Sequence, residues 1–352
     1  MALDNQWGPR RWAQNGSVRL AFDQFRPELG GEPLLIATGL GVDRHAVPDG
    51  FCEQLADHGF AVVRYDQRDG GESTHLPPTA VRNPIAALLA KRGETYTAED
   101  MADDAIAVID ELDWSSAHVL GVSLGGALAQ RVALRHPDRV RSLTSVAAVP
   151  GDVAGLRTFR YIRLRTLSKF ARLRFPDTRE GGIEAGLAVA RLVTSPRREF
   201  DEAEMRARLE SNPDPGMHDQ QAQSRQVGAR WSGPPITAIT QPTLVVHGED
   251  DPLIKPEAAH AITARIPGSR MLILPEAGHE LPAHAWKPLA AAIRELADTT
   301  TCARSRTLSS TDRLGRSHLF THDQRHAITE GTDHRYSRGT RCPRVLPWSS
   351  RP

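Results

Sequence analysis

The feature of this sequence that most constrains its fold is a regular alternation of short apolar runs with longer amphipathic stretches. We predict the apolar runs to be β-strands, at 33–38, 61–65, 117–122, 140–149, 242–247 and 270–274. The amphipathic stretches predict helices at 48–58, 98–112, 124–136, 256–266 and 283–297. Strands that alternate with helices form a mostly parallel sheet covered on both faces. The sequence therefore predicts an α/β fold, to which residues 17–25 can add an antiparallel edge hairpin.

The alternation is interrupted between residues 150 and 239. This part holds arginine-rich amphipathic stretches at 157–174, 183–193 and 202–209 and contains no convincing strand. Ligands of open parallel sheets bind outside the carboxyl ends of the strands. An insertion after the strand 140–149 would therefore lie over the ligand-binding edge of the sheet. We therefore expect a core formed by 1–149 and 240–297, with 150–239 as a helical lid. A purely structural helical excursion is the alternative.

The last part of the chain, 298–352, differs in composition from the rest. It contains ten arginines but five acidic residues, with many serines and threonines and no sustained apolar period. We expect a disordered basic tail. A basic tail could bind nucleic acid, but this one lacks clustered lysines and interleaved aromatic residues, so no nucleic-acid partner is predicted.

A candidate nucleophile lies between the predicted strand 117–122 and the predicted helix 124–136. Gly121-Val122-Ser123-Leu124-Gly125 has the spacing that holds a serine on a sharp strand-to-helix turn, where only very small side chains fit beside it. The pattern alone is weak evidence in a chain with 28 glycines. The order strand, turn, helix supplies the context that the motif requires, and Ser123 becomes the candidate nucleophile.

An acid and a base follow later strands. Asp251 comes after the strand 242–247 and His279 after 270–274, so the chain order is nucleophile, acid, base. His279 can take the serine proton, and Asp251 can hold the imidazole tautomer. Asp250 is the rival acid; Asp251 is preferred because it directly precedes Pro252, which helps to shape the loop. His247 is expected to be structural, because the position of the base is already filled.

The remaining requirement is a site for the negative oxygen of a tetrahedral intermediate. Residues 38–41, Thr-Gly-Leu-Gly, end the first long strand in a glycine-rich loop. The backbone N–H groups of Leu40 and Leu124 could converge there as an oxyanion hole. Because these donors are backbone groups, we expect Gly39 and Gly125 to matter more than the side chains at 40 and 124.

Another pair of residues is predicted to be structural. Asp66 and Arg68 follow the strand 61–65, and we expect them to form an ion pair that shapes the next turn.

Composition narrows the possible partners and location. The net charge of +1 gives no sign of a polyanion partner, and no apolar run approaches the ~20 residues of a membrane span. Three scattered cysteines indicate neither a disulfide framework nor a zinc site. We expect a cytoplasmic protein that acts on a small molecule without cofactor or metal. Its oligomeric state is left open.

From about residue 16 to 296 the sequence resembles the α/β-hydrolase superfamily. Residues 48–51, 64–74, 242–246 and 278–282 resemble in particular the aclacinomycin methylesterase type. The resemblance implies a mostly parallel eight-stranded sheet flanked by helices, with a helical lid, and a triad of Ser123, Asp251 and His279. Many superfamily members have His-Gly where this chain has Thr-Gly at 38–39, and Arg-Gly where it has Arg-Asp at 68–69.

The resemblance also implies an activity. Relatives hydrolyse carboxylic esters, in one case a methyl ester on an aromatic polyketide, and the lid sets the substrate. The leading hypothesis is a cofactor-free hydrolase that acylates Ser123 on a small or medium apolar ester. A cofactor-free haloperoxidase or perhydrolase of the same fold is one alternative. A non-catalytic small-molecule receptor is another.

Overall fold

The computed structural model describes residues 6–77, 95–176, 178–212 and 219–314. Within them eight strands form one sheet in the order β1-β2-β4-β3-β5-β6-β7-β8. The strands are β1 (Arg11–Asn15), β2 (Val18–Gln24), β3 (Glu32–Ala37), β4 (Phe60–Tyr65), β5 (Ala117–Val122), β6 (Val140–Val146), β7 (Thr243–Gly248) and β8 (Arg270–Leu274). The six predicted strands are all present. β6 ends three residues earlier than predicted, because Ala147 leaves the extended region with φ of 49°.

The sheet is parallel except at one edge. β2 pairs antiparallel with both β1 and β4, which extends the predicted edge hairpin, and β3 to β8 run parallel. β3 and β5 are neighbours, so the loop after β3 and the turn after β5 emerge side by side. This is the edge of a parallel sheet at which ligands bind.

The helices are α1 (Asp49–Asp57), α3 (Ala98–Glu111), α4 (Leu124–Arg135), α5 (Leu164–Phe170), α6 (Arg179–Val193), α7 (Glu202–Ser211), α8 (Gln220–Gly228), α9 (Glu257–Arg265) and α10 (Ala283–Leu314). The start of α3 illustrates how local sequence sets a boundary. The Thr97 hydroxyl accepts from the Asp100 backbone N–H, and the Asp100 carboxylate accepts from the Thr97 N–H, which forms a capping box.

Two apolar cores lie on the two faces of the sheet. One contains α3, α4 and α9, with Ile109, Leu128 and Ile262 almost fully buried. The other contains α1 and the first part of α10, with Phe51 and Leu289 fully buried. Helices on both faces explain why the central strands are nearly continuous runs of buried apolar residues.

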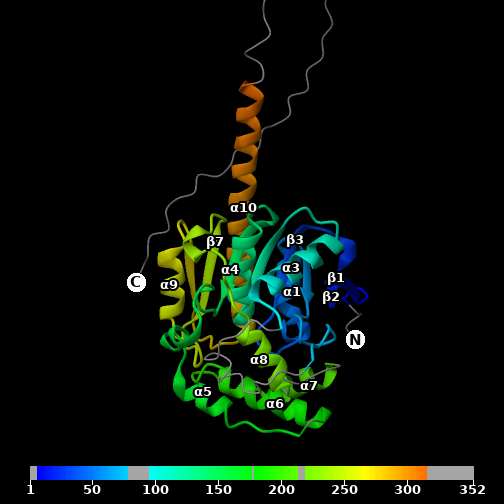
Figure 1. Ribbon diagram of the computed structural model, residues 1–352, viewed down its shortest axis with the longest axis vertical. Helices are drawn as coiled ribbons and strands as arrows, with labels where there is room; N and C mark the ends of the chain where they lie inside the picture. The colour runs from blue at the N-terminus through cyan, green and yellow to red at the C-terminus, as the bar shows by residue number, and fades with distance from the viewer. Residues whose placement is uncertain (1–5, 78–94, 177, 213–218, 315–352) are drawn as a thin grey trace, which may run out of the picture. The chain divides into compact units, whose positions relative to one another are not determined.

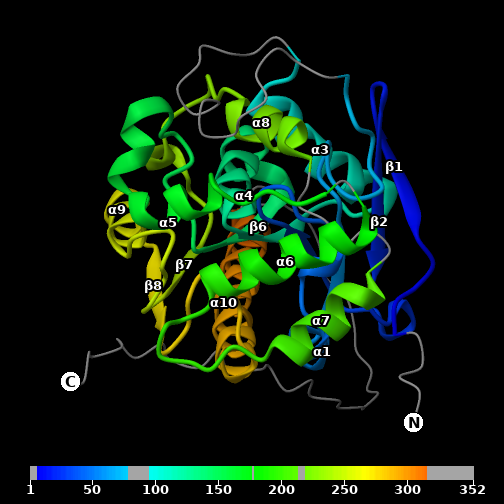
Figure 2. The same cartoon turned by 90° about the horizontal axis from the view of Figure 1, so that it is seen from below.

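We call residues 150–239 the insertion; the part of it that the structure describes contains helices and no strand. Its helices α5, α6, α7 and α8 lie below the sheet in Figure 1 and in front of it in the view from below in Figure 2. α8 has no counterpart among the predicted elements. Its sequence is rich in glutamine and has no apolar stripe, although Ser224 and Gln226 are buried.

The last helix is longer than the sequence indicates. We expected it to end at Ala297 and disorder to follow, but α10 continues to Leu314. Residues 298–314 contain no glycine or proline that would end a helix, and the next glycine is Gly315. The rest of the expected disordered tail lies outside the described residues. None of the helices in the described ranges is long and apolar enough to cross a membrane.

Candidate active site

Ser123 lies at the turn between β5 and α4. It is the residue before the helix and has φ of 58°, a left-handed conformation that is uncommon for a residue with a side chain. Its backbone N–H donates to the Val146 carbonyl oxygen at 2.8 Å, which ties the turn to β6. Strain of this kind at a half-buried serine between a strand and a helix is typical of a nucleophile elbow.

The two glycines of the motif are required by close packing. A Cβ atom on Gly121 would lie 1.9 Å from the Gly125 carbonyl oxygen, and one on Gly125 would lie 2.2 Å from the Ala37 carbonyl oxygen. Both contacts are with backbone, which has little room to move. The turn therefore brings Ser123 to the end of β3 only because these two positions have no side chain.

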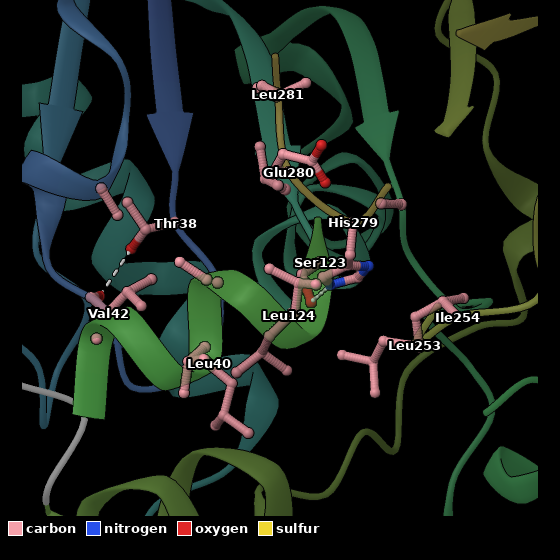
Figure 3. A pocket seen from close by; sticks show the side chains of 18 of the residues that line it. Thr38, Leu40, Val42, Ser123, Leu124, Leu253, Ile254, His279, Glu280 and Leu281 are labelled. Atoms are coloured by element: carbon pink, nitrogen blue, oxygen red, sulfur yellow. Dashed lines mark hydrogen bonds between the residues drawn. The ribbon is translucent and has the colours of Figure 1, made fainter. Parts of the chain in front are cut away.

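His279 and Asp251 meet Ser123 at this edge of the sheet. The Nε2 atom of His279 is 2.9 Å from the Ser123 Oγ, and its Nδ1 atom is 2.7 Å from the Asp251 Oδ2. Figure 3 shows the imidazole and the serine hydroxyl pointing toward one another. With Nδ1 protonated toward the carboxylate, Nε2 is free to accept the serine proton.

The environment of Asp251 keeps it ionised. Its other oxygen, Oδ1, accepts the backbone N–H groups of Leu253 (2.7 Å) and Ile254 (2.8 Å), and the residue is 1% exposed. Burial opposes the charge, but His279 and these hydrogen bonds outweigh it, so the pKa of Asp251 is lowered. The pKa of His279 is raised, because the Asp251 charge outweighs the opposing effect of burial.

Asp250, the rival acid, points to other partners. Its Oδ2 accepts from the Ser195 Oγ at 2.7 Å and from the Arg197 Nε at 2.6 Å. Both partners belong to the segment between α6 and α7, residues 194–201, which we call the α6–α7 linker. Asp250 thus binds the insertion, while Asp251 binds the histidine.

The α6–α7 linker also holds the loop that carries His279. Arg198 donates to the Glu280 carboxylate at 2.8 Å, and the Glu280 Oε1 is 3.5 Å from the Ser195 backbone nitrogen. A Cβ on Gly278 would lie 2.2 Å from the Val193 carbonyl oxygen, so the linker and the loop pack backbone to backbone. No sequence signal marked these residues, because each contact joins segments about 80 residues apart.

The predicted oxyanion donors lie beside Ser123. Leu124 is the first residue of α4, so its N–H is among those that a helix leaves without an internal acceptor. Leu40 lies on the neighbouring loop, and both leucines line the cavity together with Ser123 (Figure 3). Gly39 is less constrained than we expected, because a Cβ there would meet only ordinary contacts, 3.6 Å from the Ser123 Cβ.

The loop that carries Leu40 is fixed by the insertion. Gln226 of α8 accepts the Gly41 backbone N–H at 3.0 Å and donates to the Arg68 carbonyl oxygen at 2.9 Å. Gly41 has φ of 66° and lies against the Gln223 side chain, where a Cβ would be 2.6 Å from Cγ. The helix that the sequence did not indicate therefore supports the predicted oxyanion loop.

The prediction that Asp66 and Arg68 form an ion pair is wrong. Asp66 instead binds Arg44, with 2.5 Å between its Oδ2 and Nη1, and Arg68 binds Asp104, with 2.6 Å between Nε and Oδ2. The two side chains leave the turn in different directions, so each meets a distant partner.

His247 lies under the loop that carries Asp251, where its Nε2 donates to the Ile254 carbonyl oxygen at 3.1 Å.

The site opens into a cavity of about 1000 Å³. Ser123 and His279 lie on its wall, and most of the lining is apolar and comes from both the core and the insertion. Lining residues include Leu40, Leu124, Leu167, Phe170, Leu253 and Trp286. Trp286 packs on the α1 and α10 core and also lines the cavity. A cavity of this size is at the upper end for small-molecule sites.

The parallel sheet, the turn at Ser123 and the hydrogen-bonded serine, histidine and aspartate define an α/β hydrolase. Residues 32–283 match the family model described as alpha/beta hydrolase fold, and the chain belongs to this family. Two of its relatives are rhodomycin D methylesterases. DnrP of Streptomyces peucetius is 30% identical, over 81% of this chain and 97% of that protein. DauP of Streptomyces sp. strain C5 is 32% identical, over 74% and 89%.

Further relatives include proteins named as a depolymerase and as hydrolases. The poly(3-hydroxyalkanoate) depolymerase of Ectopseudomonas oleovorans is 30% identical over 75% of this chain and 83% of that protein. Among solved structures, the meta-cleavage product hydrolase CumD of Pseudomonas fluorescens superposes with a TM-score of 0.61 over 82% of this chain and 97% of that one, at 17% identity. The family and its methylesterase relatives identify the chain as a carboxylic ester hydrolase.

Proposed function

We propose that the chain is a serine hydrolase that cleaves carboxylic esters through an acyl-enzyme on Ser123. The observation that carries this proposal is the continuous hydrogen-bond chain from Ser123 through His279 to Asp251 at the wall of a large apolar cavity. A serine hydroxyl is a poor nucleophile at neutral pH, and a neutral imidazole 2.9 Å away can remove its proton as the bond forms.

The reaction follows from these positions. The Ser123 Oγ attacks the carbonyl carbon of the ester and transfers its proton to His279 Nε2. The N–H groups of Leu40 and Leu124 stabilise the negative oxygen of the tetrahedral intermediate. Collapse expels the alcohol, which takes the proton from His279. Water then attacks the acyl-enzyme and gives a proton to His279, which returns it to the Ser123 Oγ as the acid is released.

We propose that the substrate is the methyl ester of a bulky, mostly apolar acid. Two features support this: the relatives named as methylesterases, and a cavity of about 1000 Å³, larger than a short acyl chain fills. The helical insertion would act as the lid that closes the cavity and sets its specificity, because α5 to α8 supply much of the lining.

Labelling with a fluorophosphonate probe and hydrolysis of p-nitrophenyl esters test the chemistry, with Ser123→Ala as control. The wild type should react in both assays and the variant in neither. Equal labelling and equal hydrolysis by the two proteins would refute an acyl-enzyme mechanism on Ser123. Peroxide-dependent bromination faster than ester hydrolysis would favour the haloperoxidase alternative instead.

A panel of methyl esters tests the substrate class. We expect kcat/KM to be higher for methyl esters of polycyclic aromatic acids, including polyketides, than for methyl butyrate. A preference for short acyl chains would contradict the proposed substrate class. It would not contradict the acyl-enzyme mechanism. The cytoplasmic location and the absence of a nucleic-acid partner stay predictions from the sequence.

A further inference from the structure

An arginine lies on the helix face that lines the catalytic cavity. Leu124, Ala127 and Arg131 all contribute to the lining, and their spacing along α4 places them on one stripe of the helix. Arg131 is eight residues after Ser123, or ~12 Å further along the helix axis. The cavity therefore has the candidate nucleophile at one point of its wall and a cation about two helical turns away.

Among the described residues, this cation is buried without a carboxylate partner. Arg131 is 7% exposed, and in the described part of the chain it makes one hydrogen bond, from Nε to the Gly151 carbonyl oxygen at 2.9 Å. A guanidinium has five N–H donors, so most of its donor capacity is unused by described residues. Burying a charge in this way is costly unless an opposite charge compensates it.

The carboxylates near enough to influence Arg131 have other partners. Asp152 binds Arg265, with 2.9 Å between Oδ1 and Nη1, and Glu99 accepts from the backbone and hydroxyl of Ser232 at 2.6 and 2.8 Å. Burial lowers the pKa of Arg131 to about 10, and Glu99 and Asp152 offset only part of this effect. The side chain still carries its charge at neutral pH.

A purely structural role does not account for the charge. Arg131 holds the carbonyl group of Gly151, but the neighbouring Gln130 already accepts the Gly151 N–H at 2.7 Å and reaches the Val149 carbonyl oxygen. A neutral side chain can therefore anchor this turn. Ala127, Val149 and Val153 line the same cavity as Arg131 and carry no acceptor side chain.

We propose that Arg131 forms an anion-binding subsite of the catalytic cavity, which binds a carboxylate on the substrate at a distance from the ester that Ser123 attacks. A guanidinium and a carboxylate form two parallel hydrogen bonds, which would fix the orientation of an otherwise apolar molecule. The enzyme would then hydrolyse one ester of an acid that carries a second, free acidic group. This inference rests on the proposed function, with Ser123 as nucleophile.

The kinetic test uses p-nitrophenyl monoesters of straight-chain dicarboxylic acids with about six to ten carbons, the span that matches two helical turns. Each is compared with the corresponding monoamide, which has the same length without the charge. In the wild type, kcat/KM should favour the free acid by about 10- to 100-fold at the best length. The preference should disappear in Arg131→Gln and be largely kept in Arg131→Lys.

Two controls separate this subsite from other effects. Arg135→Gln changes an exposed arginine on the same helix, which pairs with Asp103, and should leave the preference unchanged. Fluorophosphonate labelling measures the reactive Ser123 in every variant, so that each kcat/KM ratio is compared within one protein, and its rate should be unchanged in Arg135→Gln. A wild type without preference at any length, or a preference that survives in Arg131→Gln, would overturn the subsite.

A binding measurement tests the subsite without turnover. Ser123→Ala protein is titrated calorimetrically with a free dicarboxylate and with its diamide. Tighter binding of the dicarboxylate, lost when Arg131→Gln is added, supports the subsite even if the wild type fails to hydrolyse esters. Equal binding of the two ligands overturns it. If Arg131→Gln does not fold, Arg131→Met, which keeps the apolar stem without the charge, replaces it in the same titration, and a preference that survives there overturns the subsite.

Discussion

The backbone N–H of His279 donates to the carbonyl oxygen of Val193, the last residue of α6, at 2.8 Å. The candidate base is thus hydrogen-bonded to the helical insertion through the main chain. The α6–α7 linker that follows Val193 also binds Asp250 and Glu280, on the loops that carry the acid and the base. We infer that movement of the insertion would change the position of His279.

Arg198→Gln should lower kcat by about 2- to 5-fold with little change in KM, because it weakens the Arg198–Glu280 contact that helps to position His279. The effect is small because both side chains are partly exposed. Steady-state kinetics with one ester checks it. Arg206→Gln is the matched control, because Arg206 pairs with Glu180 and Glu184 inside the insertion. An equal loss of kcat in the two variants would show that the Arg198–Glu280 contact does not position His279.

Asp251→Asn should reduce kcat by roughly 10³- to 10⁴-fold, because an amide cannot stabilise the imidazolium or hold the required tautomer. The matched variant is Asp250→Asn, which removes a carboxylate from the adjacent position but only loosens the contacts with Ser195 and Arg197. We expect less than about tenfold loss there. Ester hydrolysis by both variants, with folding checked by circular dichroism, decides whether Asp251 is the acid.

Activity should depend on pH through His279. The neutral imidazole is the base, so kcat/KM should rise with pH as His279 loses its proton, with a midpoint above the ordinary value of ~6.5 because Asp251 raises the pKa. In Asp251→Asn that negative charge is absent, so the midpoint should move to lower pH. A pH profile of kcat/KM, with NMR titration of the ring in the variant, measures both. A midpoint unchanged by Asp251→Asn would contradict the assigned coupling.

Gly125→Ala should destabilise the protein by at least about 2 kcal/mol, because the new Cβ would lie 2.2 Å from the Ala37 carbonyl oxygen. Gly39→Ala should change the free energy of unfolding by less than about 0.5 kcal/mol, because its Cβ would meet only ordinary contacts. Urea unfolding measures both variants. Comparable destabilisation would show that the oxyanion loop is as tightly packed as the turn at Ser123.

Much of the fold follows from local patterns. Apolar runs of five to ten residues gave the predicted strands, and helix starts such as Thr97 have their own capping signals. The end of α10 was misjudged because a polar composition was taken for disorder, although no helix breaker follows until Gly315. α8 was missed because its buried face is made of polar residues that bind backbone groups rather than apolar residues.

The sequence by itself determined the turn at Ser123 and the order of serine, aspartate and histidine, because glycine sterics and strand spacing act over a few residues. Only the tertiary structure decided that Asp251 rather than Asp250 contacts His279, and that Asp66 and Arg68 bind other partners. It also decided that Arg131 is buried in the cavity wall. Such contacts depend on the direction in which each side chain leaves its loop or helix, and on segments that folding brings together from distant parts of the chain.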